Sequence, residues 1–97
     1  MGHASPSELS DLTALVQALR LLAGVSETKP YVFYYRGGAF LHFHSDGARR
    51  WADVKGPDGW IEGNELPSPT TPAAEATLLE VVRRCHRDLE ARRGPRK

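Results

Sequence analysis

Two runs of aromatic and β-branched residues joined by a pair of glycines constrain this chain more than any other feature. They form the stretch YVFYYRGGAFLHFH at residues 31–44. A two-residue hairpin loop needs positive φ at its central positions, and glycine adopts positive φ without a steric clash at Cβ. The stretch therefore predicts a β-hairpin whose loop is Gly37 and Gly38.

This loop sets the register, with Arg36 opposite Ala39 and the pairing continuing to Tyr31 opposite His44. Because side chains alternate between the two faces of a strand, the register predicts two sets of residues. One set is ordinary core material: Val32, Tyr34, Ala39, Leu41 and Phe43. The other set is aromatic and rich in histidine: Tyr31, Phe33, Tyr35, Phe40, His42 and His44. An aromatic surface of this kind is unusual on a small protein in water, so the second set marks a candidate binding face.

Two further strands are expected after the hairpin. The segment RRWADVK at residues 49–55 alternates and follows a Ser-Asp-Gly turn. If a four-residue loop precedes it, Trp51 stands opposite His42 and joins the candidate binding face, while Ala52 and Val54 join the core. The turn sequence GPDG then leads into a short fourth strand over residues 60–62.

An amphipathic helix is predicted before the hairpin, over residues 7–23. Leucines and valines recur there at spacings of three and four, which is typical of one buried helix face. Ser5 and Glu8 stand at the two positions of a capping box, and Gly24 is placed to end the helix in a left-handed conformation. Residues 26–30 are expected to be a polar connection into the hairpin.

A second amphipathic helix is predicted over residues 73–91, after the start signal Thr71-Pro72. Its apolar stripe consists of Leu78, Val81, Val82, Cys85 and Leu89. Gly94 and Pro95 are expected to stop it, and residues 92–97 are expected to form a disordered basic tail.

These elements predict one small α+β domain over residues 1–97. The expected architecture is a two-layer sandwich, in which an antiparallel meander of three or four strands is flanked by an N-terminal and a C-terminal helix. Both helices would cover the core face of the sheet. The face that carries Tyr31, Phe33, Tyr35, Phe40, His42, His44 and Trp51 would then have no cover from this chain.

Composition argues against several classes of function. The net charge is +1, which gives no global attraction to nucleic acid or anionic lipid. No apolar run is long enough to span a bilayer, and no leader peptide is expected. Cys85 is the single cysteine, so an internal disulfide is impossible, and a cytoplasmic location is expected.

Two histidines of the candidate binding face have a spacing that suits a metal ion. His42 and His44 point to the same side of one strand about 7 Å apart, at a rise of about 3.3 Å per residue. Asp46, Asp53 and His86 are candidates for a further ligand. The alternative is that the two histidines pack beside Trp51 and the tyrosines at an interface.

The sequence offers little for catalysis. Cys85 lies on the apolar stripe of the last helix, where a small core residue is expected, and His86 points about 100° away from it. No serine elbow or phosphate-binding glycine loop is present, so no catalytic residue is predicted. Aromatic residues near Arg36, Arg49 and Arg50 could stack nucleic-acid bases, but the near-neutral charge makes nucleic acid an unfavoured partner.

The stretch GGAFLHFHSDG, followed by a Gly-Trp pair and a final helix, resembles small uncharacterised bacterial proteins with a luciferase-type domain. The matching residues are Gly38, His42, His44, Asp46, Gly47, Gly59 and Trp60, within residues 22–89. Ala39 and Leu41 depart from the family's usual acidic residue and glycine. The resemblance implies a shared small fold and a common role for the two histidines, and it implies nothing about light emission. The order of elements is also similar to the helix-flanked sheet domains of the MmcQ and YjbR type, which are linked to DNA binding.

The sequence thus favours a non-catalytic binding or interaction module over an enzyme. The expected partner is a second copy of the chain, bound through the uncovered sheet face. A small ligand is an alternative occupant, and a metal- or ligand-dependent enzyme around His42 and His44 is the rival function. No particular cofactor is indicated.

Overall fold

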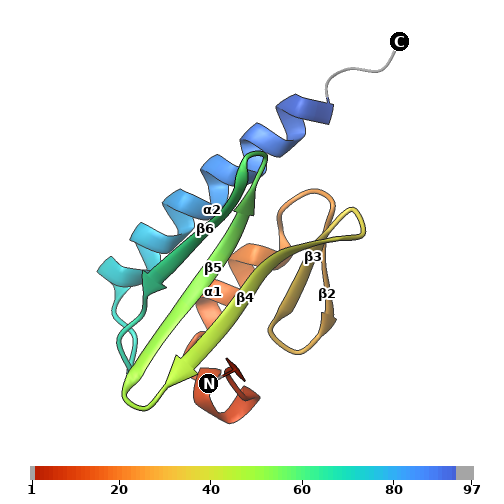
Figure 1. The fold of residues 1–97 in the computed structure, drawn as a ribbon. Helices are drawn as coiled ribbons and strands as arrows, with labels where there is room; N and C mark the ends of the chain where they lie inside the picture. The colour runs from red at the N-terminus through yellow and green to blue at the C-terminus, as the bar shows by residue number, and fades with distance from the viewer. Residues whose placement is uncertain (1, 94–97) are drawn as a thin grey trace.

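A computed structural model describes residues 2–93 of the chain (Figure 1). In chain order the elements are β1 (Gly2–His3), a 3₁₀-helix (Pro6–Leu9), α1 (Thr13–Arg20), β2 (Val25–Lys29), β3 (Val32–Tyr35), β4 (Gly38–Asp46), β5 (Arg49–Gly56), β6 (Gly59–Glu65) and α2 (Pro72–Arg93). The strands β2 to β6 form an antiparallel sheet in sequence order, and β1 pairs with the end of β4. The predicted α+β fold is confirmed. In the described range, neither helix has the length and apolar character needed to cross a membrane.

Both helices pack against the same face of the sheet. Their buried side chains meet those of β3, β4 and β5 in one core, which consists of Leu9, Leu12, Leu15, Val16, Leu19, Phe33, Phe40, Leu41, Phe43, Ala52, Val54, Leu66, Leu78, Val82 and Cys85. The apolar stripes predicted for the two helices therefore supply one side of the core. We refer to the opposite side of the sheet as the outer face.

The first hairpin does not have the predicted register. Its loop is Arg36 and Gly37, because Tyr35 pairs with Gly38. Both loop residues have positive φ, 48° at Arg36 and 92° at Gly37, as a two-residue hairpin loop requires. The backbone N–H of Arg36 donates to the carbonyl of Gly24 at 2.9 Å. The sequence is compatible with a loop at Gly37-Gly38 or at Arg36-Gly37. The prediction of the first was wrong.

A β-bulge at Phe40 then reverses the faces of the hairpin. Tyr34 pairs with Ala39 but Phe33 pairs with Leu41, so Phe40 is the extra residue, and both Phe40 and Leu41 enter the core. The predicted faces were therefore wrong for Phe33 and Phe40, which are fully buried, and for Tyr31 and Tyr35, which pack against the core. The alternation correspondingly assigns Val32, Tyr34 and Ala39, predicted for the core, to the outer face.

Beyond the bulge the predicted faces are correct. The loop between β4 and β5 has two residues, Gly47 and Ala48, so His44 pairs with Trp51 and His42 with Asp53. This register differs from the expected one by two residues. Because a shift of two preserves the alternation, His42, His44 and Trp51 remain together on the outer face.

The two edge strands were underpredicted. Residues 26–30 were expected to be a connection, but most of them belong to β2, whose polar sequence VSETK hides its strand character. Glu27 of β2 accepts hydrogen bonds from the backbone N–H of Tyr31 at 2.8 Å and from Arg20 Nε at 2.6 Å. At the other edge, β6 extends well beyond the predicted residues 60–62. The register of both edge strands shifts within the strand.

The N-terminal helix is shorter than the predicted residues 7–23, because α1 covers only Thr13–Arg20, whereas the cap predicted for the C-terminal helix is present. The capping box of Ser5 and Glu8 is present, with Ser5 N–H donating to Glu8 Oε1 at 2.8 Å, but it begins a 3₁₀-helix, and α1 starts only at Thr13. Gly24 has a positive φ of 80°, but the prediction that it ends the helix was wrong, because α1 stops at Arg20 and its C-cap is Leu21. Thr71 Oγ1 accepts from the N–H of Ala74 at 3.1 Å and caps α2.

The helix α2 runs two residues further than predicted, through Arg92 and Arg93. The remainder of the predicted basic tail lies outside the described residues.

A buried arginine joins the sheet to the N-terminal segment. Arg50 of β5 is 3% exposed, and its guanidinium group forms a two-pronged ion pair with Asp11, at 2.7 and 3.0 Å. It also donates to the carbonyls of Glu8, at 2.7 Å, and Pro67. Asp11 in turn accepts from the backbone N–H of Thr70 at 2.7 Å. One ion pair, buried on its Arg50 side, therefore connects β5, the turn before α1 and the loop that precedes α2.

Candidate functional site

The outer face carries three of the predicted site residues, His42, His44 and Trp51. The two histidines, together with residues of β5 and β6, surround a shallow hollow, which we call the histidine hollow. It has a volume of ≈ 260 Å³ and is lined by His42, His44, Asp53, Trp60 and Glu62. The residues come from three adjacent strands, so their relative positions are set by the sheet.

Asp53 is held in place at this hollow by contacts of both of its carboxylate oxygens. Its Oδ1 accepts a hydrogen bond from the backbone N–H of Gly63 at 3.0 Å, and its Oδ2 lies 3.1 Å from His44 Nε2. A carboxylate held by a backbone N–H orients the imidazole that it contacts. The orientation of His44 is therefore built into the strand geometry.

A bulge in β6 brings Glu62 to the hollow. Ala52 pairs with Asn64 and Val54 with Ile61, so Asp53 alone stands opposite the two residues Glu62 and Gly63. Gly63 takes a φ of 76°, which favours glycine. The side-chain amide of Asn64 donates to the carbonyls of Ala52 and Ile61, at 2.9 and 3.0 Å, and holds the irregular segment in place.

Aromatic rings enclose the two histidines. His44 stacks on Trp51 with ring centroids 5.6 Å apart, and His42 packs against Trp60 at 5.2 Å. The rings of His42 and His44 are 6.3 Å apart. A cation already lies over the Trp60 ring, because Lys55 Nζ is 5.4 Å from its centroid. The Trp60 side of the hollow thus has the electronic character that attracts a positive charge.

The hollow is not a ready-made metal site. Within residues 2–93, no group of three or more His, Cys, Asp or Glu side chains is arranged to hold a metal ion. Asp46 of the predicted ligand set lies at the end of β4, and His86 lies on α2, on the other side of the sheet. Of the additional ligands suggested by the sequence, only Asp53 lines the hollow with His42 and His44.

Tyr35, predicted for the candidate binding face, belongs to a different cluster. Its hydroxyl donates to Glu90 of α2, and Arg36 Nη2 lies 3.3 Å from the same carboxylate. Both hydrogen bonds lower the pKa of Glu90, and the hydrogen bond from Tyr35 has the larger effect. His86 packs edge-on against Tyr35 and contacts the carbonyl of Ala23 through Nε2 at 2.7 Å. This cluster joins the first hairpin to the last turns of α2.

Cys85 lies in the core, as predicted from its place on the apolar stripe. Burial raises the pKa of its thiol, which disfavours the reactive thiolate. A Cβ added to Gly56 would stand 3.3 Å from Cys85 Sγ, so α2 and β5 are in close contact at this point. These features assign Cys85 a packing role.

The sequence interpretation did not assign Trp60 and Glu62 to the site. Trp60 was expected on a short strand, but the length of β6 and its bulge were not foreseen. Gly63 was the available signal, because an isolated glycine within a strand pattern often marks a bulge.

Comparisons with known proteins identify no relative: no family model, curated protein or solved structure matches this chain. The resemblance to luciferase-type domain proteins stays a prediction.

Proposed function

We propose that this protein is a non-catalytic binding module that takes a small organic cation, an amine or a guanidinium group, in the histidine hollow. One observation carries the proposal: two carboxylates, two imidazoles and an exposed indole line the hollow, and no lysine or arginine is among these lining residues of the described chain.

The charges of the hollow favour a cation over an anion. Asp53 and Glu62 bring two carboxylate groups to the hollow, and the imidazoles of His42 and His44 add ring nitrogens. Trp60, with 36% of its surface exposed, adds a ring face to which a positive group is attracted. Lys55 Nζ lies 5.4 Å from the centroid of this ring, so the ring face already contacts one cation of the chain itself.

Glu62→Gln tests this proposal. We expect methylguanidinium to bind the wild type and to bind this variant about tenfold more weakly, because one charge-assisted hydrogen bond contributes about 1.5 kcal/mol. NMR titration of the indole N–H signals provides the measurement, with the signal of Trp60 shifting more than that of Trp51. Methylurea, which has a similar shape without the charge, is the matched ligand control.

A second variant makes the test sharper. Lys55→Met removes the internal cation from the Trp60 ring and should tighten binding of methylguanidinium. Glu65→Gln on the same strand removes one negative charge outside the hollow and should change the affinity less than twofold. Equal binding of methylguanidinium and methylurea, or equal loss in Glu62→Gln and Glu65→Gln, contradicts the proposal.

A divalent metal ion is the second candidate ligand. Two imidazoles with centroids 6.3 Å apart share the hollow with two carboxylates, so side-chain rotation could gather three ligands. Neutral imidazole is required, so zinc affinity should fall as the pH drops through about 6.5. Calorimetric titration with zinc, nickel and copper is expected to give saturable heat that His42→Ala/His44→Ala abolishes. Absence of saturable heat with all three ions rules out this candidate.

Homodimerisation through the outer face stays a prediction, with less apolar area to drive it than the sequence suggested. Phe33 and Phe40 belong to the core and contribute nothing to an interface. A cytoplasmic location is also proposed, from the single cysteine and its place in the core. The resemblance to luciferase-type domains would give His42 and His44 a common role in these proteins.

A further inference from the structure

The arginines of this protein fall into two groups. Those in the first group each lie within 4 Å of a carboxylate: Arg20, Arg36, Arg49, Arg50 and Arg92. The second group consists of Arg83, Arg84 and Arg87 of α2, which form no ion pair with any residue in the described range, 2–93. Arg93 at the end of α2 forms none in this range either, but it does not line the hollow that these three share. The fold thus places carboxylates beside arginines of the sheet and of α1, but not beside Arg83, Arg84 and Arg87 of α2.

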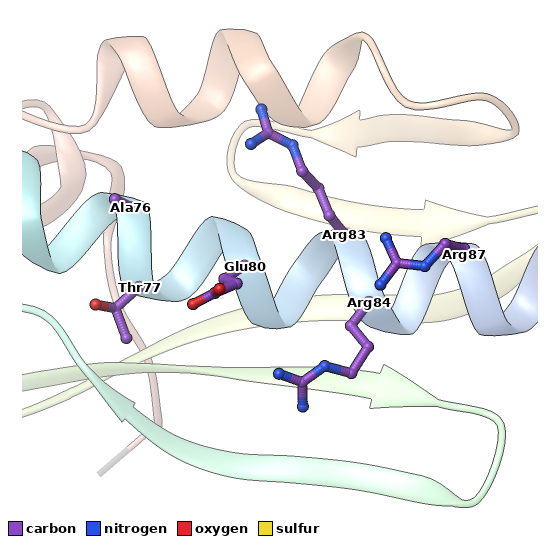
Figure 2. Close-up of a pocket in the computed structure, with 6 residues that line it drawn as sticks. All are labelled: Ala76, Thr77, Glu80, Arg83, Arg84 and Arg87. Atoms are coloured by element: carbon purple, nitrogen blue, oxygen red, sulfur yellow. The ribbon is translucent and has the colours of Figure 1, made fainter.

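The three arginines flank one open hollow on the solvent side of α2 (Figure 2). The hollow has a volume of ≈ 560 Å³, and its other lining residues are Ala76, Thr77 and Glu80. Figure 2 shows the side chain of Arg83 extending towards one flank of the helix and that of Arg84 towards the other. Three guanidinium groups therefore stand against the one carboxylate of Glu80. We call this surface the arginine face.

We propose that the arginine face binds the phosphate backbone of nucleic acid. The planar guanidinium group presents two parallel donors that match a phosphate, and an exposed arginine without a carboxylate partner retains these donors for a ligand. Arg83 and Arg87 are four residues apart, so they project from successive turns of one side of the helix. The face thus offers a row of phosphate contacts on a rigid element.

The surroundings of the arginine face argue against two other anionic partners. A membrane-surface helix inserts its apolar side into the bilayer, but the apolar side of α2, with Leu78, Val82 and Cys85, is buried in the core. A protein partner usually needs an aromatic or large aliphatic anchor, and Ala76 and Thr77 offer none in this hollow. Phosphate-backbone binding needs neither of these features.

The near-neutral net charge limits the strength of this binding without preventing it. A chain of net charge +1 attracts polyanions only where its cations are locally unbalanced. Binding should therefore be weak, independent of base sequence and sensitive to salt. With three phosphate contacts, the slope of log K against log salt should be about −2.7 on duplex DNA.

The test compares two double variants with the same net charge. Arg83→Gln/Arg87→Gln removes two unpaired arginines, and Arg20→Gln/Arg49→Gln removes two exposed arginines that have carboxylate partners. We expect the first to weaken binding of a labelled duplex at least tenfold at about 50 mM salt and to reduce the salt slope by about 1.8, and the second to change affinity less than threefold. Fluorescence anisotropy of the duplex gives the affinity, and circular dichroism confirms that both variants are folded.

Two further ligands separate nucleic acid from other anions. Polyglutamate of similar charge and vesicles that contain phosphatidylserine are titrated under the same conditions. Binding of the duplex well above that of either probe, with selective loss in Arg83→Gln/Arg87→Gln, supports the proposal. Equal loss in both double variants, stronger binding of polyglutamate or vesicles, or no binding of the duplex at low salt overturns it.

Discussion

Replacing Arg50 by methionine is expected to lower the free energy of unfolding by about 2 kcal/mol, because it removes a buried guanidinium group that donates four hydrogen bonds and leaves Asp11, whose side chain is 29% exposed, without its ion-pair partner. Asp11 would lose both of its hydrogen bonds from the guanidinium group, and the carbonyls of Glu8 and Pro67 would lose a donor. Urea denaturation followed by circular dichroism measures the change.

The neighbouring residue provides a matched control. Arg49 lies on the same strand and is paired with Glu65, but its side chain is 60% exposed. An exposed ion pair contributes little, so Arg49→Met should cost less than about 1 kcal/mol. If both variants lose a similar free energy of unfolding, burial of Arg50 adds nothing to stability, and the prediction is contradicted.

The same ion pair predicts a dependence of stability on pH. The hydrogen bonds from Arg50 are the main cause of the lowered pKa of Asp11. A carboxyl group whose pKa is lowered by folding stabilises the folded state above its unfolded pKa, about 3.9 for aspartate, and this contribution is lost as the pH falls through the folded pKa. The difference in stability between the wild type and Arg50→Met should therefore shrink below about pH 4.

Phe40→Ala is expected to lower the free energy of unfolding by about 3 to 4 kcal/mol, the usual cost of removing a buried phenylalanine. Phe40 is 0% exposed because the bulge turns it into the core beside Leu41. This result would distinguish the observed register from the one suggested by the Gly-Gly pair, in which Phe40 lies on an open face.

His42→Ala is the control for Phe40→Ala, since His42 lies two residues further along the same strand on the outer face. It should cost about 1 kcal/mol or less, in keeping with substitutions outside the core. A larger loss for His42→Ala than for Phe40→Ala would contradict the assignment of faces in β4.

The elements that could be predicted from the sequence are those whose signals are local. The apolar stripes of both helices, the positive φ of Gly24 and the cap at Thr71 depend on a few neighbouring residues, and each is present in the structure. The hairpin register depends instead on a choice between two nearly equal loop positions. In the fold, Arg36 takes the first loop position and donates its N–H to the carbonyl of Gly24, a contact that the local sequence pattern does not reveal.

The candidate site was predicted in part for the same reason. His42 and His44 share a strand beyond the bulge, so their common face does not depend on the register of the hairpin. Tyr31, Phe33, Tyr35 and Phe40 were assigned through that register, and the bulge turned all four towards the core. The contact of Asp53 with Gly63 could not be predicted, because it depends on a second bulge between strands that the sequence defines only weakly.

Irregular edge strands also determine how copies of this protein can meet. The register shifts within β2 between Glu27 and Lys29, and within β6 around Glu62 and Gly63. Irregular edges with charged side chains resist the addition of a foreign strand, which protects a sheet against open-ended stacking into fibrils. Assembly of this protein through its sheet edges is therefore disfavoured.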